Sequence, residues 1–491
     1  MSAKLGALTF DGEIMQGTEQ RQKSLTFLSA VEMAAAVRKR RVKPTALVEA
    51  HLERIALLNP RLNAFVHIDF DGARRQAVAA EAALRVGDVL GPLHGVPITV
   101  KSSIDVACWP CSCGSRLRAD YVAQNDPPLV SRLRRAGAIL LGNTNAPEFL
   151  MAYETDNLLT GRTNNPWDLT RTPGGSSGGE AAAIAARCSA GGVGSDGGGS
   201  IRVPAHYSGI CGLKPTPGRI PATGHFPESA GPFASLGVVG PMARTVSDLK
   251  LLFGVMAGPD SGDPMSAPVL LQTPSNSEIR QLRIGYFRDD GRIPVTPETN
   301  SAVRTAASAL QAAGHVVEPF LPDELESVRR IWWDLFGRAG QVALGPLYKG
   351  REAELSPILR EFIGIVHAEP ELTLSEFMGT LLERDAIRAR FLRQMERYPI
   401  LLCPGCAIPA FVHGERQWKI GGRTVEYLDA MSYCQWFNVL GNPAVVVPVG
   451  HSPEGLPIGV QVVGRPFEEE MVLAVAQEIE SSCGDLGEPP L

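Results

Sequence analysis

Gly174-Gly-Ser-Ser-Gly-Gly179 and Gly197-Gly-Gly-Ser-Ile-Arg202 are the most informative stretches of this sequence. Closely spaced glycines allow several backbone N–H groups to point at one spot, an arrangement that suits an oxyanion or a phosphate group. The alanine-rich segment between the two stretches, Glu180 to Arg187, has the composition of a helix. The region is therefore a folded structure and not a low-complexity linker.

Two common motifs overlap with these glycines, and the surrounding sequence fits neither of them. Gly192-x-Gly194-x-x-Gly197 matches the dinucleotide fingerprint, which should open a helix and precede an acidic residue about 20 residues later. Proline, glycine and lysine follow here, and no such acid appears. Residues 174–178 match the G-x-S-x-G nucleophile elbow, which should follow an apolar strand. The preceding residues 168–173 are polar and end in proline. Nucleotide binding and an α/β-hydrolase elbow are both disfavoured.

The rest of the chain alternates between short apolar strands and amphipathic helices. Val96-Pro-Ile-Thr-Val-Lys101 reads as a strand that ends on a lysine. Ser29 and Glu32 form a capping box at the start of a helix, a second helix follows and should stop at Pro60, and residues 259–280 read as a surface loop. This pattern predicts an α/β fold with a mostly buried β-sheet. The length of 491 residues would fit one large domain or two ordinary ones, and we expect a single large domain in which helices sandwich a mixed sheet.

The predicted organisation is a loose N-terminal arm, residues 1–27, followed by a catalytic domain, residues 28–485. Within this domain the mainly helical segment 320–395 is expected to form part of a lid over the substrate.

Composition narrows the classes of partner and cofactor. The net charge of -5 argues against nucleic acid, because phosphate binding needs a dense basic face. No apolar stretch is long enough to span a membrane, and residues 1–23 lack a signal peptide's apolar run, so a cytoplasmic protein is expected. The 9 cysteines, an odd number, fit reduced thiols. Cys108/Cys111 and Cys403/Cys406 lack the further ligands of a zinc site, so neither metal nor cofactor is expected.

Several motifs, in a fixed order from about residue 28 to residue 480, resemble the amidase signature family. They are residues 174–179 and the segments Gly95-Val-Pro-Ile-Thr-Val-Lys101, Gly161-Arg-Thr-Asn-Asn-Pro-Trp-Asp168, Gly198-Gly-Ser-Ile-Arg-Val-Pro204, Cys211-Gly-Leu-Lys-Pro-Thr216, Gly240-Pro-Met-Ala-Arg244 and Leu456-Pro-Ile-Gly-Val-Gln461. The resemblance implies an amidohydrolase that cleaves carboxylic amides through an acyl-enzyme.

The resemblance also implies a triad of serine, cis-serine and lysine. Carried over by position, Ser200 is the nucleophile, Ser176 is the bridging serine after a cis peptide bond, and Lys101 is the base. The implied oxyanion hole consists of the backbone N–H groups of Gly197, Gly198, Gly199 and Ser200. A free lysine is protonated near pH 7, so Lys101 needs burial to lower its pKa. Asp196 is expected to cap or hydrogen-bond the nucleophile loop. Arg202 has two candidate roles, bracing this loop or contacting the substrate, and bracing is the one expected.

Some positions depart from the family pattern and bear on the shape and polarity of the pocket. Ser102 stands where aspartate is frequent, Asn143 where lysine is frequent, and Gly197 where a larger residue is common. None of them belongs to the implied triad.

The substrate is expected to be a small-molecule amide. Aromatic and apolar side chains near the motifs are candidates for the pocket: Trp109, Met151, Tyr153, Trp332, Trp333 and Phe336. They favour aryl or apolar acyl amides, with esters and carbamates as further candidates. One alternative is the glutaminase subunit of a tRNA-dependent amidotransferase, and another is a non-catalytic binding protein on the same fold. For the oligomeric state of the chain, a homodimer is the candidate that we consider.

Overall fold

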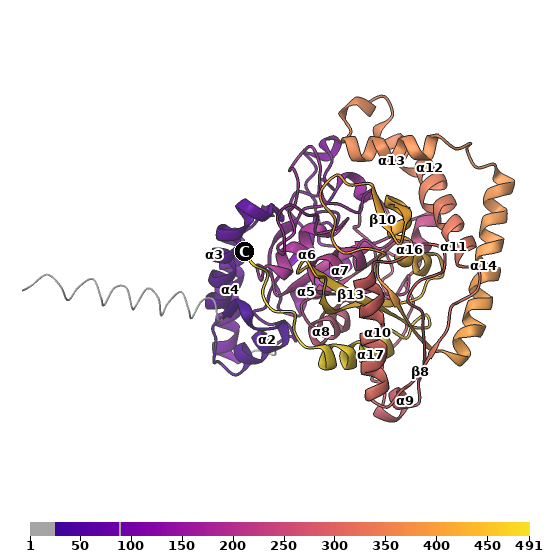
Figure 1. The fold of residues 1–491 in the computed structure, drawn as a ribbon. Helices are drawn as coiled ribbons and strands as arrows, with labels where there is room; N and C mark the ends of the chain where they lie inside the picture. Colours follow the sequence, from indigo (N-terminus) through magenta and orange to yellow (C-terminus); the bar gives the residue numbers. More distant parts are fainter. Residues whose placement is uncertain (1–24, 88–89) are drawn as a thin grey trace, which may run out of the picture.

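One large β-sheet runs through the computed structural model, which describes residues 25–87 and 90–491 (Figure 1). Of the predicted arm, residues 1–24 lie outside this described part. The sheet has 11 strands in the order β1-β3-β2-β4-β6-β5-β12-β13-β9-β7-β8. In chain order the strands are β1 (Phe65–Ile68), β2 (Pro97–Lys101), β3 (Ile139–Thr144), β4 (Gly191–Asp196), β5 (Cys211–Lys214), β6 (Val238–Ala243), β7 (Arg283–Tyr286), β8 (Val316–Pro319), β9 (Ile400–Pro404), β12 (Ala444–His451) and β13 (Pro457–Val463).

The sheet is mixed, as the sequence predicts. Strand β2 runs parallel to β3 and β4, and β7 runs parallel to β8 and β9. The other neighbouring pairs are antiparallel. The central strands are buried along their whole length, because helices cover both faces. Sheet and helices together form one domain, which confirms the predicted fold class.

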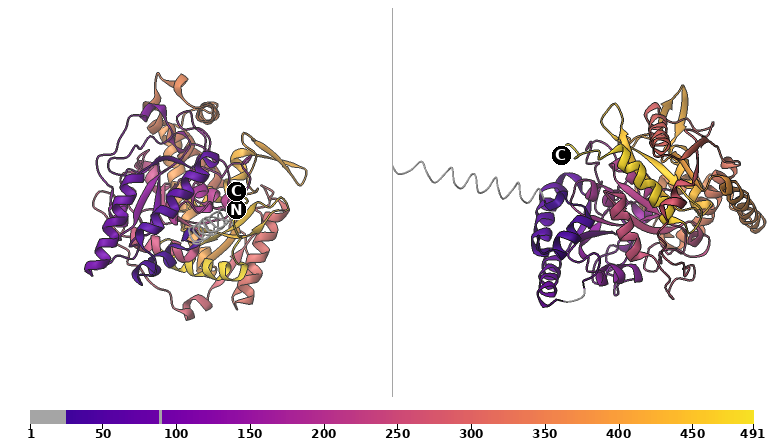
Figure 2. Two further views of the ribbon diagram at one scale, coloured as in Figure 1. Left: turned by 90° about the vertical axis from the view of Figure 1, so that its left-hand side faces the viewer. Right: turned by 90° about the horizontal axis from the view of Figure 1, so that it is seen from below.

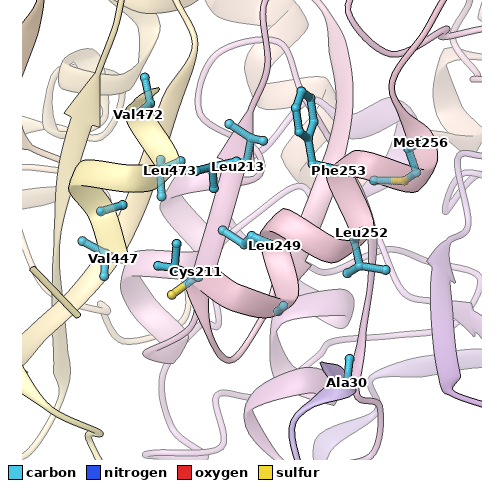
Figure 3. Close-up of a cluster of buried hydrophobic side chains, with 14 of the residues drawn as sticks. Ala30, Cys211, Leu213, Leu249, Leu252, Phe253, Met256, Val447, Val472 and Leu473 are labelled. Carbon is cyan, nitrogen blue, oxygen red and sulfur yellow. The ribbon is translucent and has the colours of Figure 1, made fainter. Parts of the chain in front are cut away.

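The side chains of β12 show how the two faces are used. Val445 and Val447 point into one apolar cluster, whereas Val446 between them points into another. On the first face lie α2 (Ala30–Arg38), α5 (Pro128–Arg135), α8 (Val246–Met256), α10 (Pro297–Ala312) and α17 (Glu469–Cys483). Figure 3 shows this core where Leu249 and Leu252 of α8 lie near Leu213 of β5.

The second face carries the short helices that hold the serine-rich segments. They are α6 (Gly178–Ala185) and α7 (Arg202–Ser208), with α16 (Ser432–Val439) beside them. Two longer helices, α3 (Pro44–Leu62) and α4 (Phe70–Val86), pack over β1 and β3 at one end of the sheet.

The segment predicted to be helical, residues 320–395, is helical in the structure. It consists of α11 (Leu325–Trp332), a π-helical turn (Trp333–Arg338), α12 (Ala339–Tyr348), α13 (Pro357–His367) and α14 (Leu374–Arg397). These helices lie at the opposite end of the molecule from α2, α3 and α4, as the orange and indigo ribbons show (Figures 1 and 2). The smaller elements are α9 (Asn276–Arg280), α15 (Tyr427–Ala430) and the hairpin of β10 (Gln417–Ile420) and β11 (Arg423–Glu426).

Two local predictions are wrong and one is confirmed. The capping box of Ser29 and Glu32 begins α2 as expected. Helix α3 continues through Pro60 to Leu62. A proline in the last turn removes only one helical N–H bond, so the turn survives. The predicted loop 259–280 ends in a helix, α9, which has its own capping box at Ser275.

Candidate active site

Lys101 is the last residue of β2, and its side chain is fully buried. Its Nζ atom lies 2.7 Å from Ser176 Oγ, 2.9 Å from Ser177 Oγ and 3.0 Å from Ser195 Oγ. Ser195 belongs to β4, which pairs in parallel with β2 and so reaches the same edge of the sheet. One amine therefore meets three hydroxyl groups inside the protein.

The environment of Lys101 favours the neutral amine. Burial lowers the pKa of Lys101 to about 7, because a charged ammonium loses its hydration inside the protein. A neutral amine has two N–H groups and one lone pair. Ser177 donates its own hydrogen to the Ser195 carbonyl oxygen at 3.2 Å, so it can only accept from Lys101. Ser176 is free to give its hydrogen to the lone pair.

The segment before Ser176 is shaped by close backbone contacts. The Gly175–Ser176 peptide bond is cis, which is the geometry that the resemblance implies. A Cβ atom on Gly175 would lie 2.6 Å from the carbonyl oxygen of Ala152 and 2.7 Å from backbone atoms of Glu154. Only glycine fits there, which explains part of the glycine-rich sequence.

Ser200 lies in the turn between β4 and α7, where the glycine loop ends. Its carbonyl oxygen accepts a hydrogen bond from the N–H of Ser177 at 3.1 Å, which ties the two serine segments together. The residue is 9% exposed and borders two adjoining cavities. Ser176 borders the smaller cavity with it. The structure thus brings the three predicted catalytic residues to one place.

A buried ion pair holds the nucleophile loop in shape. Arg202 donates to both carboxylate oxygens of Asp196, at 2.9 and 3.0 Å. The same carboxylate accepts from the N–H groups of Gly199 at 2.7 Å and Ile201 at 3.1 Å. Burial alone would raise the pKa of Asp196, but Arg202 outweighs it and holds this pKa well below its usual range. Both residues brace the loop, as expected from the sequence.

The predicted oxyanion donors divide into two groups. The N–H of Gly199 already donates to Asp196, so it is not available to the oxygen of a substrate. Gly199 is therefore removed from the predicted oxyanion donors. Within the described residues no protein acceptor lies within hydrogen-bond reach of the N–H groups of Gly197, Gly198 and Ser200. The carbonyl oxygens of Gly197 and Gly198 accept from Trp332 Nε1 at 3.0 Å and Tyr153 Oη at 2.9 Å. These contacts fix the orientation of the loop's peptide groups.

Five of the six predicted pocket residues line the larger cavity, which encloses about 960 Å³ and is called the outer cavity here. They are Met151, Tyr153, Trp332, Trp333 and Phe336. The rings of Trp332 and Phe336 stack with centroids 4.8 Å apart. The smaller cavity, called the inner cavity, encloses about 60 Å³ and shares Leu150, Met151, Ser200 and Phe336 with the outer one.

Trp109 is the exception, and its predicted place in the pocket is corrected. It belongs to the main apolar core, where its ring centroid lies 5.2 Å from that of His67, and it borders neither cavity. The N–H of Ala123 donates to the Trp109 carbonyl oxygen at 3.0 Å.

Charged side chains also line the outer cavity, and its arginines are all paired with acids. The pairs are Arg329 with Asp429, Arg330 with Asp334 and Glu383, Arg338 with Asp334, and Arg416 with Glu154 and Glu361. No arginine of this wall lacks a carboxylate partner among the described residues. The wall therefore presents no free guanidinium group to a substrate.

The described part of the chain, residues 25–87 and 90–491, holds neither a candidate metal site nor a membrane span. No group of three or more His, Cys, Asp and Glu side chains there could hold a metal ion. No helix there is long and apolar enough to cross a membrane. The nine cysteines are free thiols, and Cys111, Cys403 and Cys406 are buried, so the two C-x-x-C pairs belong largely to the interior.

The comparisons with known proteins agree with this geometry. A family model described as Amidase matches residues 46–473. An indoleacetamide hydrolase of Bradyrhizobium diazoefficiens is 35% identical over 467 residues, which are 93% of this chain and 87% of that protein. The chain belongs to the amidase signature family. The enzyme class predicted from the sequence, an amidase that acts on carbon–nitrogen amide bonds, is thereby confirmed.

Other members of the amidase signature family show its range. One subunit of the glutamyl-tRNA(Gln) amidotransferase of Acidothermus cellulolyticus is 34% identical, over 92% of this chain and 94% of that protein. The crystal structure of a bacterial aryl acylamidase of the amidase signature family matches with a TM-score of 0.82 at 28% identity, covering 93% of this chain and 96% of the other.

Sequence reasoning missed two residues of the site, Ser195 and His225. Ser195 contacts Lys101 only because β4 lies beside β2, and a glycine-rich run gave no sign of a strand. His225 lines the inner cavity from a loop far along the chain. Neither residue lies in a sequence motif that indicates a role in the site. Their positions became clear only from the three-dimensional arrangement of the strands and loops.

Proposed function

We propose that this amidohydrolase cleaves amides through an acyl-enzyme on Ser200, with Ser176 as the proton relay and Lys101 as the base. The observation that carries the proposal is the buried Lys101 amine, 2.7 Å from Ser176 Oγ, with its pKa lowered by burial to about 7. A serine hydroxyl is a weak nucleophile until a neighbouring base accepts its proton. Near neutral pH a large fraction of Lys101 is the free base that this step needs.

In the first half of the reaction Ser200 Oγ attacks the amide carbonyl carbon. Its proton passes to Ser176, and the hydrogen of Ser176 passes to Lys101. The tetrahedral intermediate then collapses: Ser176 gives a proton to the nitrogen, recovers one from Lys101, and the C–N bond breaks. In the second half water attacks the acyl carbon and gives a proton to Ser176, whose own hydrogen passes to Lys101. The C–O bond to Ser200 then breaks, Ser176 returns a proton to Ser200 Oγ, and Lys101 gives its extra proton back to Ser176. The products are an amine or ammonia and a carboxylic acid.

The developing negative charge on the carbonyl oxygen needs donors that are already in place. The N–H groups of Gly197, Gly198 and Ser200 are the proposed donors. Trp332 and Tyr153 support this role, because their bonds to the carbonyl oxygens of Gly197 and Gly198 restrain the loop. Removal of one preorganised donor typically costs about 3–4 kcal/mol of transition-state stabilisation.

The proposed substrates are amides with an aromatic or apolar acyl group. Near Ser200 the outer cavity is walled by Tyr153, Trp332, Trp333, Phe336 and Phe362, and aromatic walls gain most from flat or long apolar groups. The name of the indoleacetamide hydrolase agrees with such an acyl group. Esters with the same acyl group and carbamates with similar apolar substituents are further candidates. Because α11 and the π-helical turn supply three of these rings, segment 320–395 is proposed to act as a lid.

The glutaminase subunit of an amidotransferase is the second candidate, since an amidotransferase subunit is one of the relatives. Glutamine carries a carboxylate, which is usually held by an unpaired arginine. The four arginines of the outer cavity all have acidic partners, which disfavours glutamine. A non-catalytic binding protein is disfavoured as well, because such a protein has no need for a buried, neutral lysine beside two serine segments.

The test is to assay the purified chain alone with phenylacetamide, octanamide and glutamine. The proposal expects kcat/KM for phenylacetamide or octanamide to exceed that for glutamine by at least about tenfold, a gap of about 1.4 kcal/mol. A tenfold preference for glutamine would overturn the proposed acyl group and favour the amidotransferase role.

A further inference from the structure

The inner cavity is too small for a ring. It encloses about 60 Å³ beside Ser200, and the rings of Phe149, Phe233 and Phe336 form part of its wall. A cavity needs about 10–15 Å³ to hold one water molecule, whereas a cavity that holds benzene measures about 150 Å³. The space therefore fits a few heavy atoms, such as ammonia or methylamine, and is smaller than a benzene ring requires.

The position of Ser176 indicates which part of the substrate enters this space. A group that gives a proton to the leaving nitrogen must lie within hydrogen-bond reach of it. Ser176 borders the inner cavity and does not line the outer one, whereas Ser200 borders both. With the proposed catalytic roles, the leaving nitrogen faces the inner cavity and the acyl group extends into the outer cavity.

His225 lines the inner cavity, and its ring carries a hydrogen-bond acceptor that has no partner among the described residues. Its Nδ1 atom lies 2.9 Å from the Pro227 carbonyl oxygen, which can only accept, so Nδ1 carries the hydrogen. The Nε2 atom then has a free lone pair, and it is buried with no partner among the described residues. Burial and the nearby Lys101 lower the pKa of His225 to about 4, so the ring is neutral at pH 7.

The loop that carries His225 is fixed to the segment after the catalytic lysine. His225 forms a bridge with Ile104, and the N–H of Phe226 donates to the Ser103 carbonyl oxygen at 2.8 Å. The N–H of Asp105 donates to the Gly224 carbonyl oxygen at 2.9 Å. The ring is thus held at a fixed place relative to Lys101.

We propose that the inner cavity receives the leaving nitrogen, that His225 Nε2 accepts a hydrogen bond from its N–H, and that the enzyme therefore prefers primary amides. This inference rests on the proposed function, since it uses Ser176 as the proton donor. In the tetrahedral intermediate one N–H points to His225, which turns the nitrogen lone pair toward Ser176. Protonation of that lone pair and cleavage of the C–N bond release ammonia. The leaving group of an anilide carries a phenyl ring, and the inner cavity is too small for that ring.

The size limit is tested with phenylacetamide and its N-phenyl derivative, which share one acyl group. For the wild type kcat/KM is expected to be at least about tenfold higher for the primary amide. Of the two cavities Phe233 lines only the inner one, so Phe233→Ala enlarges that space. The variant is expected to reduce the difference in kcat/KM between the primary amide and the anilide. An anilide that matches or exceeds the primary amide in the wild type would overturn the assignment of the inner cavity.

The role of His225 is tested with a matched pair of variants. The amide of His225→Asn can still donate to the Pro227 carbonyl but lacks an acceptor at the Nε2 position. His225→Gln keeps an acceptor there and loses the bond to Pro227. Each is assayed with phenylacetamide and with methyl phenylacetate, whose leaving oxygen has no N–H. The amide-to-ester ratio of kcat/KM is expected to fall at least about tenfold in His225→Asn and to stay within about threefold of wild type in His225→Gln.

A purely structural role for His225 predicts a different result, because it would lower both rates together and leave the ratio unchanged. An unchanged ratio in His225→Asn would overturn the inference. If neither variant folds, the comparison with Phe233→Ala still decides it. Failure of the proposed function is distinguishable: the wild type would then neither hydrolyse the ester nor react with a serine-directed fluorophosphonate.

Discussion

The Nζ atom of Lys101 lies 2.7 Å from Ser176 Oγ in the interior of the protein, whereas Ser200 borders the cavities. In the proposed mechanism the base is separated from the substrate by a hydroxyl group. A lysine in this position keeps its lowered pKa because solvent does not reach it. The proposed relay through Ser176 would connect this buried base to Ser200, which the substrate can reach.

The pH dependence of kcat/KM should report the ionisation of Lys101. Only the neutral amine can accept a proton, so kcat/KM should rise with pH to a plateau, with a midpoint near the pKa of about 7. One pH unit below the midpoint, about a tenth of the plateau is expected. The measurement is a pH profile with a neutral amide. A profile that is flat down to about pH 5 would exclude Lys101 as the base.

Ser195→Ala serves to identify the titrating group. The ammonium form of Lys101 can donate to three hydroxyl groups, and Ser195 is one of them at 3.0 Å. Hydrogen bonds to a charged form stabilise that form, so the loss of this acceptor should move the midpoint to lower pH. A midpoint that shifts upward or does not move would indicate that another group controls the profile.

Asp196→Asn should destabilise the whole domain. The variant leaves Arg202 buried without its carboxylate, and breaking a buried ion pair on one side typically costs about 3–5 kcal/mol. Chemical unfolding of the two proteins gives the difference in the free energy of unfolding. Glu354→Gln breaks the exposed pair with Arg351 and is the control, for which no resolvable change is expected. Equal stability of Asp196→Asn and wild type would refute the bracing role.

Trp332→Phe should slow turnover through the oxyanion loop. The variant keeps an aromatic ring against Phe336 but loses the bond from Nε1 to the Gly197 carbonyl oxygen. A lost hydrogen bond of about 1 kcal/mol corresponds to roughly a fivefold fall in kcat, with a smaller change in KM. Trp333→Phe is the matched control, because Trp333 Nε1 bonds to Glu369. Equal effects of the two variants on kcat would contradict the role of the Gly197 contact.

The sequence was sufficient for the parts of the fold and site that depend on local pattern. The apolar strand ending at Lys101 and the capping box at Ser29 and Glu32 carry their own signals, and both features are present. The fold class followed from the alternation of strands and helices. The family motifs allowed Lys101, Ser176 and Ser200 to be assigned to one site. These residues are far apart in the sequence, so no local pattern could have grouped them.

Other features depend on long-range packing that no local pattern reports. Strand β4 carries no alternating apolar pattern because of its glycines, and a Cβ atom on Gly192 would lie 2.0 Å from Glu180 Oε1. The glycines allow α6 to approach the strand closely. Trp109 shows the opposite error, since an aromatic residue near the lysine strand fills the core and not the pocket. His225 could be found only once its loop was placed beside the lysine strand.

The most direct test of the account is to map the site of a fluorophosphonate adduct by peptide mass spectrometry, together with the activity of Ser200→Ala. The account predicts one adduct on Ser200 in the wild type, no adduct in Ser200→Ala, and loss of turnover in that variant by several orders of magnitude. Normal folding of the variant is checked by its circular dichroism spectrum. An adduct on Ser176 or Ser177, or amide turnover that survives in Ser200→Ala, would contradict it.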